Sequence, residues 1–95
     1  MTDKELADAL VEAGILQRKP LSPYVTIDGE DIGHTVALSD WRVAGKVLEL
    51  MGDFEYMWPF KFDGLWCMAD QYGNDISSNE SLPRAIIEAW YEARQ

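Results

Sequence analysis

The sequence predicts a single α+β domain over residues 1–95, in which antiparallel β-hairpins pack against helices. Three segments repeat apolar residues with helical spacing, and two β-rich runs each lead into Asp-Gly, a dipeptide typical of tight hairpin turns. A chain of 95 residues suits one domain. Its hydrophobic fraction of 47% supplies enough apolar material for a core. The predicted element order is α-β-β-α-β-β-α, with the sheet between helices as an α/β/α sandwich.

The first helix is predicted over residues 3–14. Thr2 is a suitable N-cap, and Glu5 three residues later completes a capping box. Leu6 and Leu10 begin an apolar stripe with helical spacing, and Gly14 is a typical helix end. The following segment, residues 17–23, contains two prolines and is predicted to be a loop.

The first hairpin is predicted around Asp28-Gly29. A two-residue turn would place Ile27 opposite Glu30, whereas a four-residue loop would place Ile27 opposite Ile32. We favour the second register because it keeps apolar side chains on one face. The two strands then cover residues 24–27 and about 31–37.

A second helix is predicted over residues 40–51, with Ser39 as its N-cap and Gly52 after its end. Its apolar stripe is wide, which indicates a well-buried helix. The last helix follows a polar loop over residues 71–80 and begins near Ser81, with a proline tolerated in its first turn.

The second hairpin carries the clearest pattern in the chain. Aromatic residues alternate with others, which makes one face of a strand aromatic: Phe54, Tyr56, Trp58, Phe60 and Phe62. Asp63-Gly64 predicts a type I′ turn, which pairs Phe62 with Leu65, Phe60 with Cys67 and Trp58 with Ala69. We expect this aromatic face to enter the core, with Cys67 pointing into it. Pro59 cannot donate to a ladder, so the strand is predicted to lie at an edge or to carry a bulge.

The reverse face of this hairpin is too apolar for a fully solvated surface. Either a helix covers it, which would place helices on both sides of the sheet, or it is a contact patch. Met57, Trp66 and Met68 are its candidate apolar contact residues, because Met and Trp are frequent at interfaces.

The net charge of −9 is concentrated in the two hairpin segments. Residues 23–40 sum to −4 and residues 53–80 to −5, while the other segments cancel. These acids are either ordinary turn formers and edge protectors, or an acidic surface for a basic partner. The charge excludes direct binding to nucleic acid or an anionic membrane. The candidate partner-binding acids are Asp28, Glu30, Asp31, Asp53, Glu55, Asp63, Asp70 and Asp75.

No pattern for catalysis, metal binding or a cofactor is evident. His34 is the only histidine and is expected on a strand with a partly exposed ring, while Cys67 is the only cysteine. Asp28-Gly29-Glu30-Asp31 lacks the spacing of a calcium loop. We therefore expect a protein that is not an enzyme, and a cytoplasmic location, because neither a signal peptide nor a membrane span is evident.

Three stretches resemble the phage ABA sandwich domain family of tailed phages and prophages. They are Tyr24 to Gly29, Ser39 to Met51, which is similar to the family's central helix, and Glu80 to Ala89, which is similar to its closing helix. The resemblance implies an α/β/α sandwich and a phage or prophage origin, and it carries no catalytic residues.

Taken with the charge, the resemblance suggests a small accessory protein that binds a host protein. The most concrete version is an inhibitor of a bacterial defence complex, such as an anti-CRISPR protein that occupies a basic nucleic-acid channel. The alternative is a homo-oligomeric structural or assembly module, a homodimer for instance, joined through Met57, Trp66 and Met68.

Overall fold

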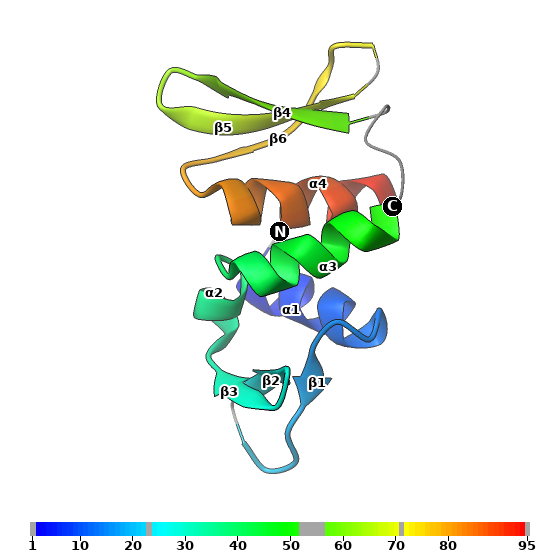
Figure 1. The fold of residues 1–95 in the computed structure, drawn as a ribbon, viewed down its shortest axis with the longest axis vertical. Coiled ribbons are helices and arrows are strands. Elements are labelled where there is room, and N and C mark those ends of the chain that lie inside the picture. The colour runs from blue at the N-terminus through cyan, green and yellow to red at the C-terminus, as the bar shows by residue number, and fades with distance from the viewer. Residues whose placement is uncertain (1, 23, 52–56, 71, 95) are drawn as a thin grey trace.

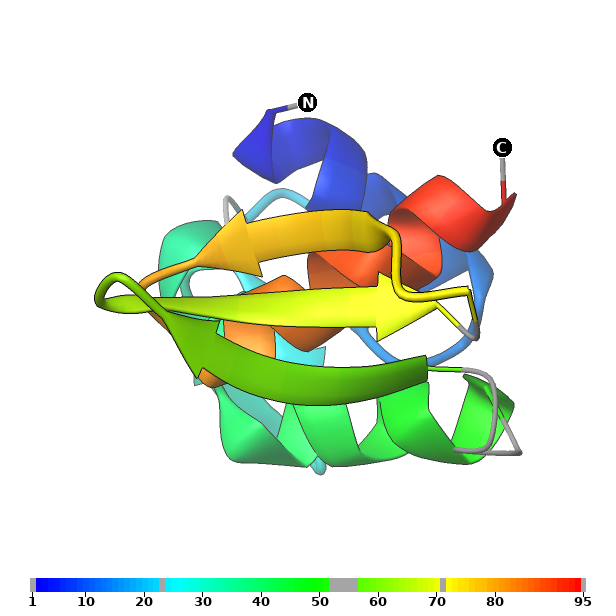
Figure 2. The same cartoon turned by 90° about the horizontal axis from the view of Figure 1, so that it is seen from above.

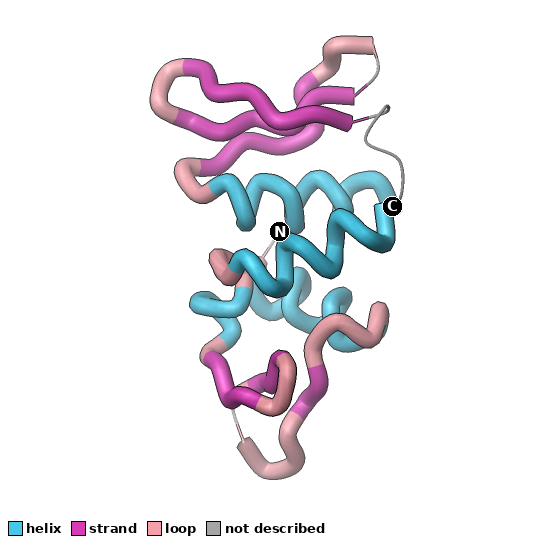
Figure 3. Tube along the Cα trace, in the orientation of Figure 1, coloured by secondary structure: helices cyan, strands magenta, loops and turns pink. Residues whose placement is uncertain are grey.

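A layer of helices lies between two small antiparallel sheets (Figure 1). The computed structural model describes residues 2–22, 24–51, 57–70 and 72–94. One sheet has the order β1-β2-β3 and the other the order β4-β5-β6 (Figure 3). In chain order the elements are α1 (Asp3–Glu12), β1 (Gln17–Arg18), β2 (Val25–Ile27), β3 (Glu30–Ile32), α2 (His34–Ala37), α3 (Trp41–Met51), β4 (Met57–Phe62), β5 (Leu65–Asp70), β6 (Asp75–Asn79) and α4 (Leu82–Arg94).

The α+β class and the antiparallel hairpins are confirmed, but the layers are ordered differently from an α/β/α sandwich. Helix α4 lies across one face of the β4-β5-β6 sheet (Figure 2). In the described part of the chain, no helix lies on the opposite face (Figure 1). The helices form the central layer because they share one core with both sheets.

Helix α1 begins as the capping pattern predicts. Thr2 Oγ1 accepts a hydrogen bond from the Glu5 backbone N–H at 3.2 Å. Helix α3 also covers the predicted segment, but Ser39 is not its N-cap. Asp40 takes that position: its carbonyl accepts from the Ala44 N–H at 3.1 Å, and its carboxylate accepts from the Arg42 N–H at 2.7 Å.

The first hairpin adopts the register that we did not favour. Ile27 pairs with Glu30 across a two-residue turn, and both turn residues, Asp28 and Gly29, have positive φ. Ile32 is instead opposite Val25, so apolar side chains still share the buried face. The return strand ends at Ile32 because helix α2 follows, and Gln17–Arg18, predicted as loop, forms the third strand β1.

The second hairpin has the predicted register. Phe62 pairs with Leu65, and the two turn residues have φ of 53° and 80°, as a type I′ turn requires. Strand β4 is an edge strand, as Pro59 indicates. The segment predicted as a polar loop contains strand β6, whose pairing with β5 is irregular between Met68 and Ala69.

The buried face of this sheet is the opposite of the one predicted. Met68 is fully buried in the core, and Trp66 packs against it. Phe60 and Cys67 pair with each other, and Cys67 is the neighbour of Met68 in β5. Because successive side chains alternate between the two sides of a strand, Phe60 and Cys67 point away from α4. Side-chain alternation could not identify the buried side, because both faces of this hairpin are apolar.

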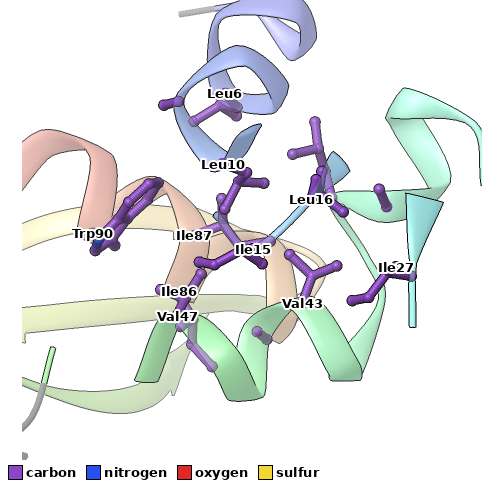
Figure 4. Close-up of a cluster of buried hydrophobic side chains, with 14 of the residues drawn as sticks. Leu6, Leu10, Ile15, Leu16, Ile27, Val43, Val47, Ile86, Ile87 and Trp90 are labelled. Carbon is purple, nitrogen blue, oxygen red and sulfur yellow. The ribbon is translucent and has the colours of Figure 1, made fainter. Parts of the chain in front are cut away.

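The main core joins residues that are distant in sequence (Figure 4). Leu10 of α1, Val47 of α3 and Ile87 of α4 are all fully buried. Arg84 of α4 connects this helix to α1, because its Nη2 lies 2.7 Å from Asp3 Oδ1, and its Nε lies 3.0 Å from Glu88 one turn further along α4. None of the helices in the described residues is both long and apolar enough to cross a membrane.

Candidate functional site

The side of the β4-β5-β6 sheet that faces away from α4 is the candidate site, and we call it the outer face. Strand alternation and register place seven described residues on it. They are Phe60, Phe62, Leu65, Cys67, Ala69, Asp75 and Ser78. Helix α4 holds the other side in place: Ser77 Oγ donates to the Ala85 carbonyl at 2.7 Å, which fixes β6 against the helix.

The outer face presents apolar surface to solvent. Phe62 is 70% exposed, while Phe60 and Leu65 are half-buried. Cys67 and Ala69 on the central strand are buried between their neighbours. Exposed aromatic side chains with a rigid support are typical of protein-binding surfaces. Sequence reasoning assigned the phenylalanines to the core, so it missed them as site residues.

Two acids at the rim of the outer face have no cationic partner among the described residues. Asp63 lies in the β4-β5 turn, and Asp75 begins β6 opposite Ala69. Both are exposed, and neither forms an ion pair within the described ranges. Their charge therefore remains available to an approaching molecule.

Asp70 organises the turn between β5 and β6. Its Oδ1 accepts from the backbone N–H groups of Asn74 and Tyr72, each at 2.9 Å. These hydrogen bonds, first that of Asn74, lower the pKa of the Asp70 carboxyl below its ordinary value. The carboxylate is thus engaged by its own loop, which matches the role of a turn former.

The acids of the first hairpin are paired with cations from other segments. Asp28 lies 2.9 Å from Lys46 Nζ and Glu30 lies 2.8 Å from Arg42 Nη1, so helix α3 supplies both partners. Asp31 lies 2.7 Å from Lys19 Nζ. The charge of the hairpin segment alone does not reveal this pairing, because the cations come from outside the hairpin. This end of the molecule is therefore close to electrical balance.

The remaining candidates divide into buried and undescribed residues. Met68 lies beneath α4, and Trp66 is half-buried with Lys61 Nζ 5.5 Å from its ring centre. A helix thus covers Met68, as the first of the two alternatives predicted. That alternative also placed helices on both sides of the sheet, and among the described residues they lie on one side only (Figure 1). Asp53 and Glu55 lie outside the described residues, as does the side chain of Met57.

His34 and Cys67 do not form a catalytic pair. His34 begins α2 rather than lying on a strand, and its Nε2 is buried with no hydrogen-bond partner among the described residues. Cys67 lies on the outer face of β5, which points away from all the helices, α2 included (Figure 1). Within residues 2–22, 24–51, 57–70 and 72–94, no group of three or more His, Cys, Asp or Glu side chains could hold a metal ion.

No family model, curated protein or solved structure matches the chain. The resemblance to the phage ABA sandwich family therefore stays a prediction.

Proposed function

We propose that this protein works by binding another protein, one with a basic surface, through its outer face. The observation that carries this proposal is the combination of exposed Phe62 with two unpaired rim acids, Asp63 and Asp75. Helix α4 supports the sheet from behind, so the face is held ready for contact.

The aromatic and acidic parts of the outer face would contribute differently. Burial of a Phe side chain yields about 1.5–3 kcal/mol, which favours affinity and a slow dissociation rate. Unpaired carboxylates attract a basic partner from a distance and raise the association rate. A cationic side chain of the partner, placed over the ring of Phe60 or Phe62, would gain a cation–π contact and would also be attracted by the nearby carboxylates.

A narrower proposal follows from the predicted phage kinship. The partner would be a bacterial defence complex that handles nucleic acid, and the outer face would occupy part of its basic channel. Such an inhibitor would act without catalysis and would reside in the host cytoplasm. The first hairpin, whose acids are paired, would take little part. The acidic surface that stands in for nucleic acid would therefore be confined to the end of the molecule that carries the second sheet.

Self-association is disfavoured by several features of the same sheet. Two outer faces would bring Asp63 and Asp75 of both copies together, which is repulsive. The free edge of β4 carries Pro59 and Lys61, both of which oppose strand pairing between copies. Met68, a contact residue in the homodimer hypothesis, is fully buried.

Photocrosslinking from position 62 would identify the partner. A photoreactive phenylalanine analogue replaces Phe62 in the full chain, and the same analogue at Val36 serves as control, because Val36 is 62% exposed on α2. The partner captured at 62 alone is then purified, and its Kd is measured at low and high salt. Identical capture at both positions would refute the proposal.

Matched variants then test the two contributions. Phe62→Ser is expected to weaken binding at least about tenfold, and Asp63→Lys with Asp75→Lys is expected to slow association and flatten its salt dependence. Val36→Ser and Glu49→Lys are controls of the same chemistry on other exposed surfaces. A Kd that ignores both salt and the outer-face variants would contradict this function.

A further inference from the structure

Strand β5 pairs with its two neighbours through alternate residues. In an antiparallel ladder, successive residues direct their backbone N–H and C=O groups to opposite sides. The Asp70 N–H donates to the carbonyl of Asn74, which directly precedes β6, at 2.9 Å. On the same alternation, Met68 and Trp66 also direct their backbone groups toward β6. Cys67 lies between them and directs its groups toward β4.

Ser78 occupies the free edge of β6. Ser77 and Asn79 pair with Met68 and Trp66, so their backbone groups face β5. Ser78 lies between them and therefore directs its own N–H and C=O away from the sheet. Neither group has a hydrogen-bond partner among the described residues. No described element runs beside this edge in the plane of the sheet (Figure 1 and Figure 2).

The opposite edge of the sheet, on β4, is less suited to a further strand. Phe60 faces β5, so Pro59 and Lys61 direct their backbone groups to the free edge of β4. Pro59 has no N–H to donate, and Lys61 carries a charge of the same sign as a basic partner. Strand β6 contains neither proline nor lysine. Of the two edges, that of β6 therefore offers the better template.

Helix α4 holds β6 in place from the other side. Ser77 Oγ donates to the Ala85 carbonyl at 2.7 Å, and Asn79 Nδ2 donates to Glu88 Oε1 at 3.4 Å. These contacts use the side chains that face the helix, so they leave the Ser78 backbone groups free. An edge that is already fixed loses little conformational entropy when a partner binds.

Two carboxylates flank this free edge. Asp75 begins β6, and Glu80 follows directly after its last residue. Both side chains are exposed, and neither forms an ion pair within the described ranges. They lie about 15 Å apart along an extended strand, with Ser78 between them. A segment that pairs with Ser78 would therefore pass both charges.

We propose that the basic partner contributes an extended segment, which adds to β6 as a fourth strand and carries Lys or Arg near both ends. Hydrogen bonds to the Ser78 backbone would supply affinity, and the cations beside Asp75 and Glu80 would supply selectivity. This inference rests on the proposed function, because it names the part of the same basic partner that reaches the edge of the outer face.

A second copy of this chain fits the edge poorly. Two β6 strands paired in antiparallel about Ser78 would bring Asp75 of each copy toward Glu80 of the other. Like charges so placed across a strand pair are destabilising. A segment with cations at both ends meets the same carboxylates favourably.

The first test examines the edge of the full-length chain without a partner. The Ser78 amide hydrogen should exchange with solvent at least about tenfold faster than that of Asn79, which faces β5. Hydrogen exchange detected by NMR measures both. Equal protection of the two amides, in a monomer or in a dimer, would show that the edge is already occupied and would overturn the proposal.

The second test uses a pool of synthetic peptides as the probe. Each peptide has about seven residues, enough to span both carboxylates, with Lys at both ends and Val, Thr or Tyr between. A matched pool has Glu at both ends. The immobilised full-length chain should retain lysine-ended peptides at least about tenfold better at low salt. Equal retention of the two pools, or retention of neither, would contradict the added strand.

A retained lysine-ended peptide is then titrated into the chain. Its binding should slow exchange of the Ser78 amide, and N-methylation of its central backbone nitrogens should raise Kd about tenfold. Glu80→Lys should raise Kd at least about threefold, whereas Glu49→Lys, the same change on exposed α3 surface, should leave it within about twofold. Binding that tolerates N-methylation, or that leaves Ser78 exchange unchanged, would refute strand addition.

Phe62→Ser separates this inference from the proposed function. Phe62 lies on β4, so its truncation should leave the Kd of the peptide within about twofold of the native value. If the partner captured from position 62 ignored both Glu80→Lys and competition by the peptide, the added strand would be wrong and the outer face would still stand. If the peptide bound at Ser78 while capture from positions 62 and 36 were identical, the added strand would be supported and the outer-face contact would be wrong.

Discussion

The carboxylate of Asp40 holds both the backbone and the side chain of Arg42. Its Oδ1 accepts from the Arg42 N–H at 2.7 Å and from Nε at 3.1 Å, while Oδ2 accepts from Nη2 at 3.0 Å. Arg42 extends further to Glu30 on β3. One side chain thus caps helix α3 and, through Arg42, connects that helix to the first sheet.

Removal of this cap should lower stability. Asp40→Ala is expected to reduce the free energy of unfolding by about 1 kcal/mol, because N-cap losses fall near that value. Ser39→Ala, the residue that the sequence favoured as cap, should change it by less than about 0.5 kcal/mol. Urea unfolding followed by circular dichroism measures both. Equal effects of the two variants would contradict the assignment of Asp40 as the cap.

The same carboxylate should make stability depend on pH. Arg42 donates hydrogen bonds that lower the pKa of Asp40 below its ordinary value of 3.8, although burial acts in the opposite direction. The unfolded chain therefore binds the proton at higher pH than the folded chain. The stabilisation is complete well above pH 3.8 and is lost as pH falls through the lower folded pKa.

Asp40→Asn isolates this charge, because asparagine also caps helices well. The native chain should exceed the variant in stability at pH 7, and the difference should shrink steadily between about pH 4 and pH 2. Urea titrations at several pH values provide the measurement. A difference that stays constant over this range would mean that the Asp40 charge contributes nothing.

Two glycines should respond to alanine in opposite directions. Gly45 lies within helix α3, and a Cβ there would meet nothing within 4 Å, so Gly45→Ala should stabilise by about 0.5–1 kcal/mol. Gly64 has φ of +80° in the β4-β5 turn, so Gly64→Ala should destabilise by about 1 kcal/mol or more. Thermal melts compare the two, and stabilisation by Gly64→Ala would contradict the type I′ turn.

Truncation of opposite faces of the second sheet should distinguish its buried side. Met68→Ala opens a cavity beneath α4 and should cost about 2–5 kcal/mol. Phe62→Ala removes a ring that is 70% exposed and should cost less than about 1 kcal/mol. Chemical denaturation of both variants tests this order. If Phe62→Ala were the more damaging, the aromatic side would be the core side after all.

Local signals in the sequence predicted the elements that depend on local geometry. The Thr2 cap, the helix around Val43 and the Asp63-Gly64 hairpin all follow from contacts between near neighbours. The register predicted for the first hairpin was wrong for another reason. We favoured Ile27 opposite Ile32 in order to keep apolar side chains on one face. A two-residue turn also keeps Ile32 on the buried face, where it lies opposite Val25.

Features that depend on distant partners could not be predicted in the same way. Strand β6 looked like a loop because its inward positions are polar: Ser77 and Asn79 meet α4 through hydrogen bonds to Ala85 and Glu88. The acidic first hairpin looked unpaired because Lys46 and Arg42 approach it only in the folded chain. For this reason the predicted acidic surface over both hairpins is reduced to a candidate site on the second sheet alone.

The brevity of strands β1, β2 and β3 has a consequence for motion. Strands of two and three residues do not persist alone, and this sheet depends on buried Val25 and Ile27 and on surface ion pairs that salt weakens. Its amide hydrogens should therefore exchange through small local openings, whereas those of α4 should require global unfolding. Local melting of this sheet would therefore separate Asp28 from Lys46 and Glu30 from Arg42, and would expose those charges while the helices remain intact.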